Sequence, residues 1–154
     1  MVLAFIANCT YALESDRQAK VVVQAPLGCV SKLKLNQTEC KNGLTIEQGS
    51  MLIKSRYGLI QHSKEGVVSV LMKGDQVYME QLMDDQELMV IKANEINYQK
   101  AEEKVYLKGH VSIVSSIGVT TGEDIEFDLK TQEINAQGED NSQQFKIVID
   151  QKND

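Results

Sequence analysis

From Gly43 onward, apolar and polar residues alternate in a series of short segments. Alternation with a period of two is typical of β-strands that bury one face and expose the other. The segments that show it are LTIEQ, SMLIKS, YGLIQH, VVSVLMKG, QVYMEQ, LMVIKANEINYQ, KVYLKGHVSIVS, EDIEFDL, QEINAQG and QFKIVID. The pieces between them are short and polar, as hairpin turns require. The pattern therefore predicts consecutive antiparallel strands.

Two stretches contain enough helix-forming residues to compete with this interpretation. They are Asp84–Met89 and Lys100–Lys104. An isolated helix this short is not stable in water, because its nucleation is unfavourable. We therefore expect both stretches to be turns.

The chain also contains an internal repeat. Residues 93–109 align with residues 122–138 at an offset of 29 residues, so that Ile96 matches Ile125 and Tyr98 matches Phe127. The alternation continues in phase through Gly109, and Gly138 ends the second copy. Glycine relieves curvature and permits bulges in strands. We expect Gly109 and Gly138 to be points where a long strand bends.

One face of the predicted strands is apolar and must be covered. A single antiparallel sheet would leave this face in water, so the sheet must fold on itself or form a sandwich. The residues expected to line the common interior are Ile96, Tyr98, Val105, Leu107, Val111, Ile113, Ile125, Phe127, Phe145, Ile147 and Ile149. Five methionines, at 51, 72, 79, 83 and 89, fall at strand positions. Each alone is explained by core filling, but together they predict a soft, adaptable interior.

Composition narrows the class of protein. The chain has 154 residues, is 42% hydrophobic and contains a single proline, which favours one ordered domain over disorder. Its formal net charge is −6, and its basic residues are scattered among acidic ones. This distribution argues against a nucleic-acid partner. No segment approaches the ~18 consecutive apolar residues of a membrane span, so we expect a soluble chain.

The first residues, MVLAFIANCTYA, resemble the end of a secretory signal, although no basic residue precedes the apolar run. We interpret residues 1–12 as a signal-peptide remnant that is removed, residues 13–150 as one domain and residues 151–154 as a polar tail. A lipid anchor on Cys9 is an alternative, but Asn8 is a poor residue before a lipidated cysteine.

Removal of Cys9 leaves Cys29 and Cys40. An even pair in an exported chain favours a disulfide that closes a small loop. Two separately buried thiols remain the alternative, because sequence does not show whether the two Cα atoms lie within bridging distance. A zinc site would need further ligands, and none are nearby.

Motifs for catalysis or cofactor binding are absent from the sequence. His62 and His110 are the only histidines, and there is no HExxH, CxxC, GxSxG, GxGxxG or P-loop motif. The acidic pairs Asp84–Asp85 and Glu102–Glu103 fall in expected turns. Carboxylates from different strands could still converge as in a glycosidase. We nevertheless expect no enzymatic activity, no cofactor and no metal site.

Several segments share their order and spacing with a known family. They are LESDR at 13–17, NGLTIEQGSMLI at 42–53, KGDQVYMEQ at 73–81, LKGHVSI at 107–113 and GEDIEFDLKTQEINAQG at 122–138. From Leu13 to Ile149 the chain resembles the periplasmic lipopolysaccharide-transport proteins of the LptA (OstA-like) type. It departs from them at Asn42–Gly43, where the usual order is reversed, at His110, where asparagine is common, and over Pro26–Lys41, which looks like a local elaboration.

The resemblance implies an open antiparallel β-jellyroll in the periplasm whose apolar interior takes the acyl chains of lipopolysaccharide. The residues expected to bind lipid are Met79, Ile96, Tyr98, Leu107, Val111, Ile113, Ile125 and Phe127. Lys34, Lys54, Arg56, Lys73 and Lys92 could meet the phosphates of the head group, although a solvated strand face explains each of them.

The resemblance also implies head-to-tail stacking, both with further copies and with homologous jellyrolls of inner-membrane and outer-membrane components. The expected edges are Ala19–Gln24 with Leu44–Glu47 at one end and Phe145–Ile149 at the other. Two alternatives stay open at this point. One is the membrane-anchored LptC-like sister component without its N-terminal helix, and the other is a β-rich carbohydrate-binding or adhesion module.

Overall fold

The computed structural model describes residues 16–136 and 145–151. The strands are β1 (Val22–Gln24), β2 (Val30–Lys32), β3 (Gln37–Cys40), β4 (Leu44–Gln48), β5 (Met51–Ser55), β6 (Tyr57–Ser63), β7 (Gly66–Leu82), β8 (Leu88–Gln99), β9 (Lys104–Ser115), β10 (Gly118–Asp128), β11 (Ile134–Ala136) and β12 (Lys146–Ile149). Helical structure in these ranges is confined to a turn at residues 16–18 and the 3-10 turn η1 (Leu33–Leu35). The expected signal remnant and Gly138 lie outside the described residues.

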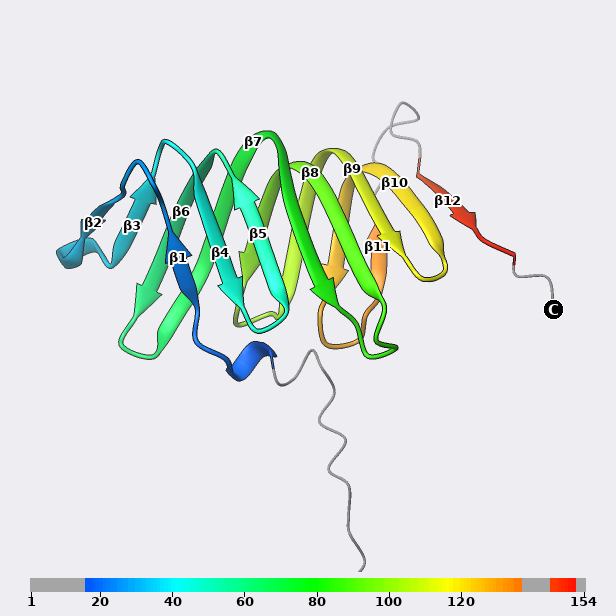
Figure 1. Cartoon of the computed structure of the whole chain (residues 1–154), viewed down its shortest axis with the longest axis horizontal. Helices are drawn as coiled ribbons and strands as arrows, with labels where there is room; N and C mark the ends of the chain where they lie inside the picture. Colours follow the sequence, from blue (N-terminus) through cyan, green and yellow to red (C-terminus); the bar gives the residue numbers. More distant parts are fainter. Residues whose placement is uncertain (1–15, 137–144, 152–154) are drawn as a thin grey trace, which may run out of the picture.

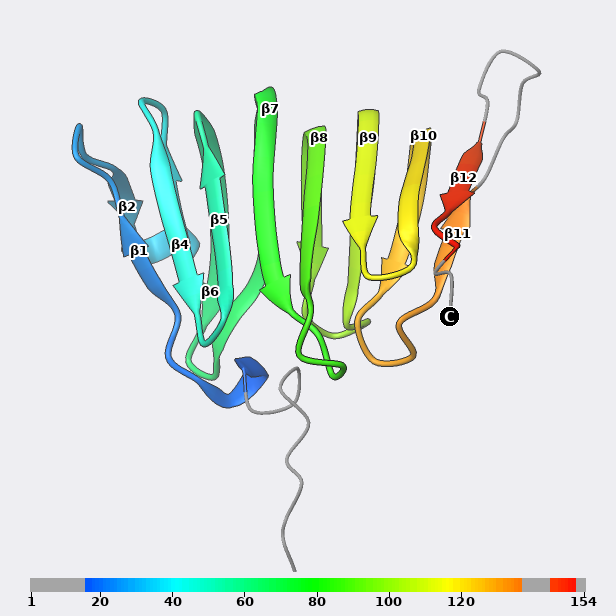
Figure 2. The ribbon, with the colours of Figure 1, turned by 45° about the vertical axis from the view of Figure 1, so that its right-hand side comes forward.

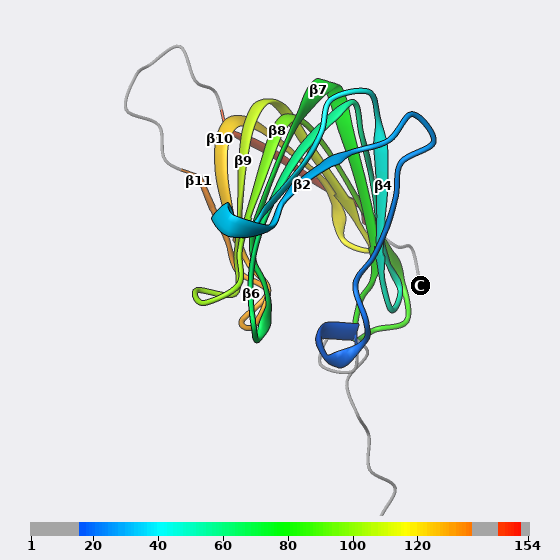
Figure 3. The same cartoon turned by 90° about the vertical axis from the view of Figure 1, so that its left-hand side faces the viewer.

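All described strands belong to one antiparallel sheet that is folded along its middle (Figures 1 and 3). The long strands β7–β10 run through both halves and stand side by side (Figure 2). We name the halves wall A, which also contains β1, β4, β5 and β12, and wall B, which also contains β2, β3, β6 and β11. The sheet does not close into a barrel, so the prediction of an open, all-β jellyroll is confirmed.

The long strands bend along one line, which we name the crest. The register shifts there between Lys73 and Val77, between Lys92 and Glu95, and between Gly122 and Asp124. In β9 the bend falls at Gly109, whose φ is +77°. Because this left-handed conformation strains residues with a Cβ atom, the strand that continues through Gly109 needs glycine at that point. The edges of the walls away from the crest, which we name the rims, are formed by the turns β4–β5, β7–β8 and β9–β10 in wall A and β6–β7, β8–β9 and β10–β11 in wall B. The line between the two rims is the seam.

The interior lies between the walls and is lined mainly by aliphatic side chains. Its buried residues include Ile46, Ile53, Ile60, Met72, Met79, Ile91, Ile96, Leu107, Ile113, Ile125 and Phe127. Buried and more exposed side chains alternate along the arms of the long strands β7–β10, as the period-two pattern predicts. The methionines at 72, 79, 83 and 89 are buried, and the partly exposed Met51 packs against the same core.

Three expectations about strands are wrong. VVSVLMKG and QVYMEQ are not separate strands but parts of the continuous β7, because pairing with β8 resumes beyond the bend. Leu44–Glu47 is not an edge, since β4 pairs with both β1 and β5, and the edges at that end are β1 and β2. Phe145, Ile147 and Ile149 are exposed instead of buried in the interior, because β12 lies at the edge of wall A and no further described strand covers it.

The stretches near residues 84 and 100 form turns, as expected. Gln86 N donates to Met83 O, and Glu103 N donates to Lys100 O. Cys29 and Cys40 are joined by a disulfide that ties the segment before β2 to the end of β3. Among the residues described, no helix has the length and apolar character needed to cross a membrane.

Candidate functional site

Side chains that are apolar except for one threonine in each wall form a continuous row across the inner face of each wall. In an antiparallel sheet, directly opposite residues lie on the same face about 5 Å apart. The paired residues of the wall A row are Val23, Ile46, Ile53, Met79, Ile91, Ile113, Thr120 and Ile147. Those of the wall B row are Thr38, Ile60, Val70, Tyr98, Val105, Phe127 and Ile134. The two rows face each other across the interior and run nearly from one end of the sheet to the other.

A cavity of about 840 Å³ lies between the rows in the half of the molecule that contains β1, β4, β5 and β6. Its walls are mainly aliphatic, with Ile46 and Ile53 on wall A and Ile60 and Val70 on wall B. Its charged lining comes from the N-terminal residues 17–20 and from the turns that follow β6 and β8, and the strand residues Thr38, Gln48 and His62 add further polar groups. These segments lie along the rims, so the cavity has an apolar interior and a polar mouth at the seam.

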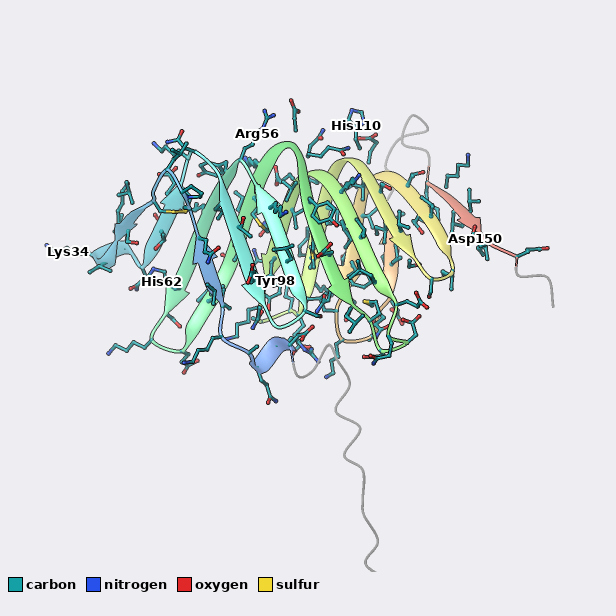
Figure 4. The ribbon with its side chains drawn as sticks, in the orientation of Figure 1. Lys34, Arg56, His62, Tyr98, His110 and Asp150 are labelled. Atoms are coloured by element: carbon teal, nitrogen blue, oxygen red, sulfur yellow. A yellow bond between two sulfur atoms is a disulfide. The ribbon has the colours of Figure 1, made fainter. Side chains whose placement is uncertain are left out.

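The expected lipid-binding residues divide into two groups. Met79, Ile96 and Tyr98 line the cavity. Leu107, Val111, Ile113, Ile125 and Phe127 are buried on the interior face but do not line it. The expected phosphate contacts Lys34, Lys54, Arg56, Lys73 and Lys92 are also absent from the lining. In Figure 4, Arg56 lies along the crest, whereas His62 and Tyr98 lie below it.

Several lining residues were not among the expected lipid-binding residues. They are Ile46, Met51, Ile53, Ile60, Val67 and Val70. The signal that identifies most of them is the alternation in LTIEQ, SMLIKS and YGLIQH, where every second residue is apolar. The alternation in these strands is as regular as that in the repeat. The pairing of strands, which the sequence does not show, places Ile53 beside Met79 and Val70 beside Tyr98.

The N-terminal turn, residues 16–19, is anchored on the rim of wall A. The Asp16 carboxylate accepts hydrogen bonds from the backbone N and the Oγ of Ser50, and the N···Oδ1 distance is 3.0 Å. Gln48 Nε2 donates to the carbonyl oxygens of Arg17 and Ala19, at 3.0 and 3.1 Å. The backbone of this turn is therefore held by groups other than the Arg17 side chain.

The Arg17 side chain crosses the seam and forms an ion pair with Glu103 in the β8–β9 turn of wall B. The contact joins the two rims at the mouth of the cavity. The half-buried Tyr98 lies nearby, and burial and the negative charge of Glu103 raise its pKa while Arg17 lowers it. Since the ordinary pKa of tyrosine is about 10, the Tyr98 phenol stays neutral near pH 7.

A second contact crosses the seam in the other half of the molecule. Gln132 Nε2, in the β10–β11 turn of wall B, donates a hydrogen bond of 2.7 Å to Asp84 Oδ2 in the β7–β8 turn of wall A. Among the described strands, no pairing joins the rims. The seam of the described structure is thus crossed by side-chain contacts, which can separate without breaking the sheet.

The described residues contain no group of three or more His, Cys, Asp and Glu side chains that could hold a metal ion. His62 lies at the cavity, with Nε2 3.5 Å from Thr38 Oγ1. His110 is at the crest, where its Nδ1 lies 3.4 Å from Glu123 Oε1. The two histidines are therefore in separate places.

A comparison with curated protein sequences gives no match. Among solved structures, the chain is similar to LptH from Pseudomonas aeruginosa, described as the LptA-homologous periplasmic component of the conserved lipopolysaccharide transport device. The TM-score is 0.79 and the sequence identity 22%, and the match covers 89% of this chain and 99% of the LptH chain. This similarity agrees with the folded, open sheet. The family model for the LptA/(LptD N-terminal domain) LPS transport proteins matches residues 31–133. The chain therefore belongs to the LptA/LptD N-terminal domain family of LPS transport proteins.

Proposed function

We propose that this protein is a periplasmic carrier of lipopolysaccharide that holds acyl chains between walls A and B. The observation that carries the proposal is the cavity of about 840 Å³, which is aliphatic inside and reaches the seam at a polar mouth. Membership of a transport-protein family supports a carrier and not an enzyme. The Cys29–Cys40 disulfide supports an oxidising compartment such as the periplasm.

The energetics of acyl chains explain why a carrier needs such an interior. Each methylene removed from water contributes about 0.8 kcal/mol, so a lipid with several chains cannot cross an aqueous space unprotected. The interior rows supply branched and thioether side chains, with Met51 and Met79 at the cavity. Flexible methionines adapt to irregular ligands. A lipid would therefore be shielded without being fixed in one orientation.

The ends of the sheet support head-to-tail stacking with further copies or with homologous jellyrolls. Wall A ends in β1 and β12, and wall B ends in β2 and β11. Unpaired strand edges accept a strand from another chain. Exposed apolar residues lie at both ends: Leu27, Val30, Leu33 and Leu35 at one, and Phe145, Ile147 and Ile149 at the other. Stacking in this way would join the interior rows of successive copies.

Site-specific photo-crosslinking in cells tests lipid carriage. A probe at Ile53, which lines the cavity, should form adducts with lipopolysaccharide, whereas a probe at its exposed neighbour Lys54 should not. A second pair, Phe127 and Glu126, tests whether lipid also enters the half where the walls are packed together. Equal labelling at Ile53 and Lys54, or none at Ile53 and Phe127, would contradict carriage in the interior.

A further inference from the structure

Three cationic side chains line the mouth of the aliphatic cavity. They are Arg17 and Lys20 beside the rim of wall A and Lys100 on the rim of wall B. The chain as a whole has a formal net charge of −6, so this grouping differs from the average surface. At the other end of the seam, the β7–β8 turn carries Asp84, Asp85 and Glu87. The lining of the cavity also includes Glu65 and Glu103, so three cations stand against two carboxylates there, whereas the charged residues of the β7–β8 turn are all acidic.

The three cations differ in how they are paired. Arg17 forms an ion pair with Glu103, and the side chains are 26% and 39% exposed. Lys20 and Lys100 are exposed and form no ion pair with any described residue. An anion at the mouth could therefore bind Lys20 and Lys100 without displacing a described ion-pair partner. To bind Arg17 it would have to displace Glu103, whose carboxylate is partly exposed to solvent.

Arginine can exchange one oxyanion for another with little movement. Its planar guanidinium binds carboxylates and phosphates through the same pair of parallel N–H···O bonds. At this site the backbone of residue 17 is fixed separately, because Gln48 holds the Arg17 carbonyl and Ser50 holds Asp16. Loss of the contact with Glu103 would thus free the guanidinium without releasing the N-terminal turn.

We infer that the mouth of the cavity binds the phosphate of an acylated lipid, with Arg17 exchanging Glu103 for the phosphate and Lys20 and Lys100 adding charge. This inference rests on the proposed function, since acyl chains must occupy the cavity below the head group. The exchange also removes the contact that joins the rims at this point. Head-group binding and separation of the seam are then one event.

The test compares lipid A with the same lipid after removal of its phosphates. Dissociation constants for both are measured for wild type, Arg17→Gln and the double variant Lys20→Gln/Lys100→Gln. Wild type should prefer the phosphorylated lipid by about tenfold or more, the factor expected for charge-assisted hydrogen bonds. Arg17→Gln should lose most of this preference while binding the dephosphorylated lipid as before, which also shows that the variant is folded. The double variant should lose part of it.

The variant Glu103→Gln distinguishes two roles of the ion pair. Arg17 either exchanges Glu103 for the lipid phosphate, or it only holds the two rims together. Without its competitor, Arg17 should bind phosphorylated lipid a few-fold more tightly, with little change for the dephosphorylated form. An equal gain for both lipids would mean that the ion pair only closes the seam and would overturn the head-group assignment. Lys54→Gln, an exposed residue outside the cavity, is the matched control and should change neither constant.

Two further outcomes overturn the inference in distinct ways. If Arg17→Gln keeps the wild-type preference, the phosphate is bound elsewhere. If inorganic phosphate alone binds wild type as tightly as lipid A and depends on Arg17, the site takes free phosphate and not a lipid head group. Failure of wild type to bind either lipid would instead contradict the proposed function itself.

Discussion

Gly109 and Asn94 pack against each other at the crest, where β9 and β8 bend together. A Cβ atom on Gly109 would lie 2.8 Å from Asn94 Nδ2 and 3.0 Å from Asn94 Cβ. The φ angle of Gly109, +77°, is in the region that L side chains rarely adopt. Both the backbone conformation and the close approach therefore require glycine at the bend.

Gly109→Ala should lower the free energy of unfolding by more than the roughly 1–3 kcal/mol typical of a strained backbone conformation, because the contact with Asn94 adds to that strain. Gly43→Ala is the control, since Gly43 has a φ of +99° but nothing within 4 Å of a Cβ atom. Urea denaturation of the two variants measures the difference. Equal losses at both positions would mean that the contact with Asn94 contributes nothing.

The disulfide between Cys29 and Cys40 should stabilise the end of the sheet that carries β2 and β3. Their sequence separation is 11, and a loop of this size reduces the entropy of the unfolded chain by an amount worth roughly 2–3 kcal/mol. Reduction should therefore lower the melting temperature of wild type. The double variant Cys29→Ala/Cys40→Ala should melt at the reduced wild-type temperature and should not respond to reductant. A reductant effect that persists in this variant would show that the disulfide is not its cause.

The sequence predicted individual strands better than their place in the sheet. Gly43 and Gly49 flank LTIEQ, so β4 was predicted with its observed bounds, whereas Lys73-Gly74-Asp75 has the composition of a turn and divided β7 in two. A bend within a strand and a turn between two strands have similar amino-acid composition. They differ in whether the strand continues beside the same neighbour, and that depends on pairing with β8.

The candidate site shows the same limit. The interior phase of Met79, Ile96 and Tyr98 follows from alternation alone, and these residues line the cavity. Arg17 and Glu103 are 86 residues apart in sequence, and neither lies in a pattern that points to the other. Their contact depends on the folding of the sheet, which brings the N-terminal turn of wall A to the β8–β9 turn of wall B.

Gln81 is a buried polar residue whose replacement should stabilise the protein. It is 3% exposed, and its Oε1 has no hydrogen-bond partner among the described residues. A buried acceptor without a partner costs about 1–3 kcal/mol. Gln81→Met, which keeps the shape and removes the amide, should raise the free energy of unfolding by about 1 kcal/mol. Its neighbour on the opposite strand is the apolar Met89.

Gln48→Met is the matched control for this change. Gln48 donates both of its hydrogen bonds to the N-terminal turn, so the same substitution should destabilise instead of stabilise. Thermal unfolding followed by circular dichroism distinguishes the two signs. A loss of stability in Gln81→Met would indicate that a water molecule or another unseen group satisfies the amide.

Phe127 and Phe145 should respond very differently to truncation. Phe127 is 2% exposed in the interior row of wall B, whereas Phe145 is 44% exposed before β12. Phe127→Ala should cost about 3–5 kcal/mol, because it removes a buried ring and leaves a cavity. Phe145→Ala should stay within about 0.5 kcal/mol in the isolated chain. Similar losses for both would mean that the end of the sheet is covered in solution.

Ile147 offers a test of stacking between copies. It lies in the edge strand β12, opposite Thr120 of the wall A row, and is 43% exposed. If the apolar end of wall A packs on another jellyroll, Ile147→Lys should abolish self-association with little effect on folding, because a charge would be buried in the interface. Val68→Lys is the control, since Val68 has the same exposure but lies in β7, away from both ends. Sedimentation velocity across a range of concentrations should show wild type and Val68→Lys forming larger species and Ile147→Lys remaining monomeric. If all three proteins sediment in the same way, this end of wall A does not form the contact between copies.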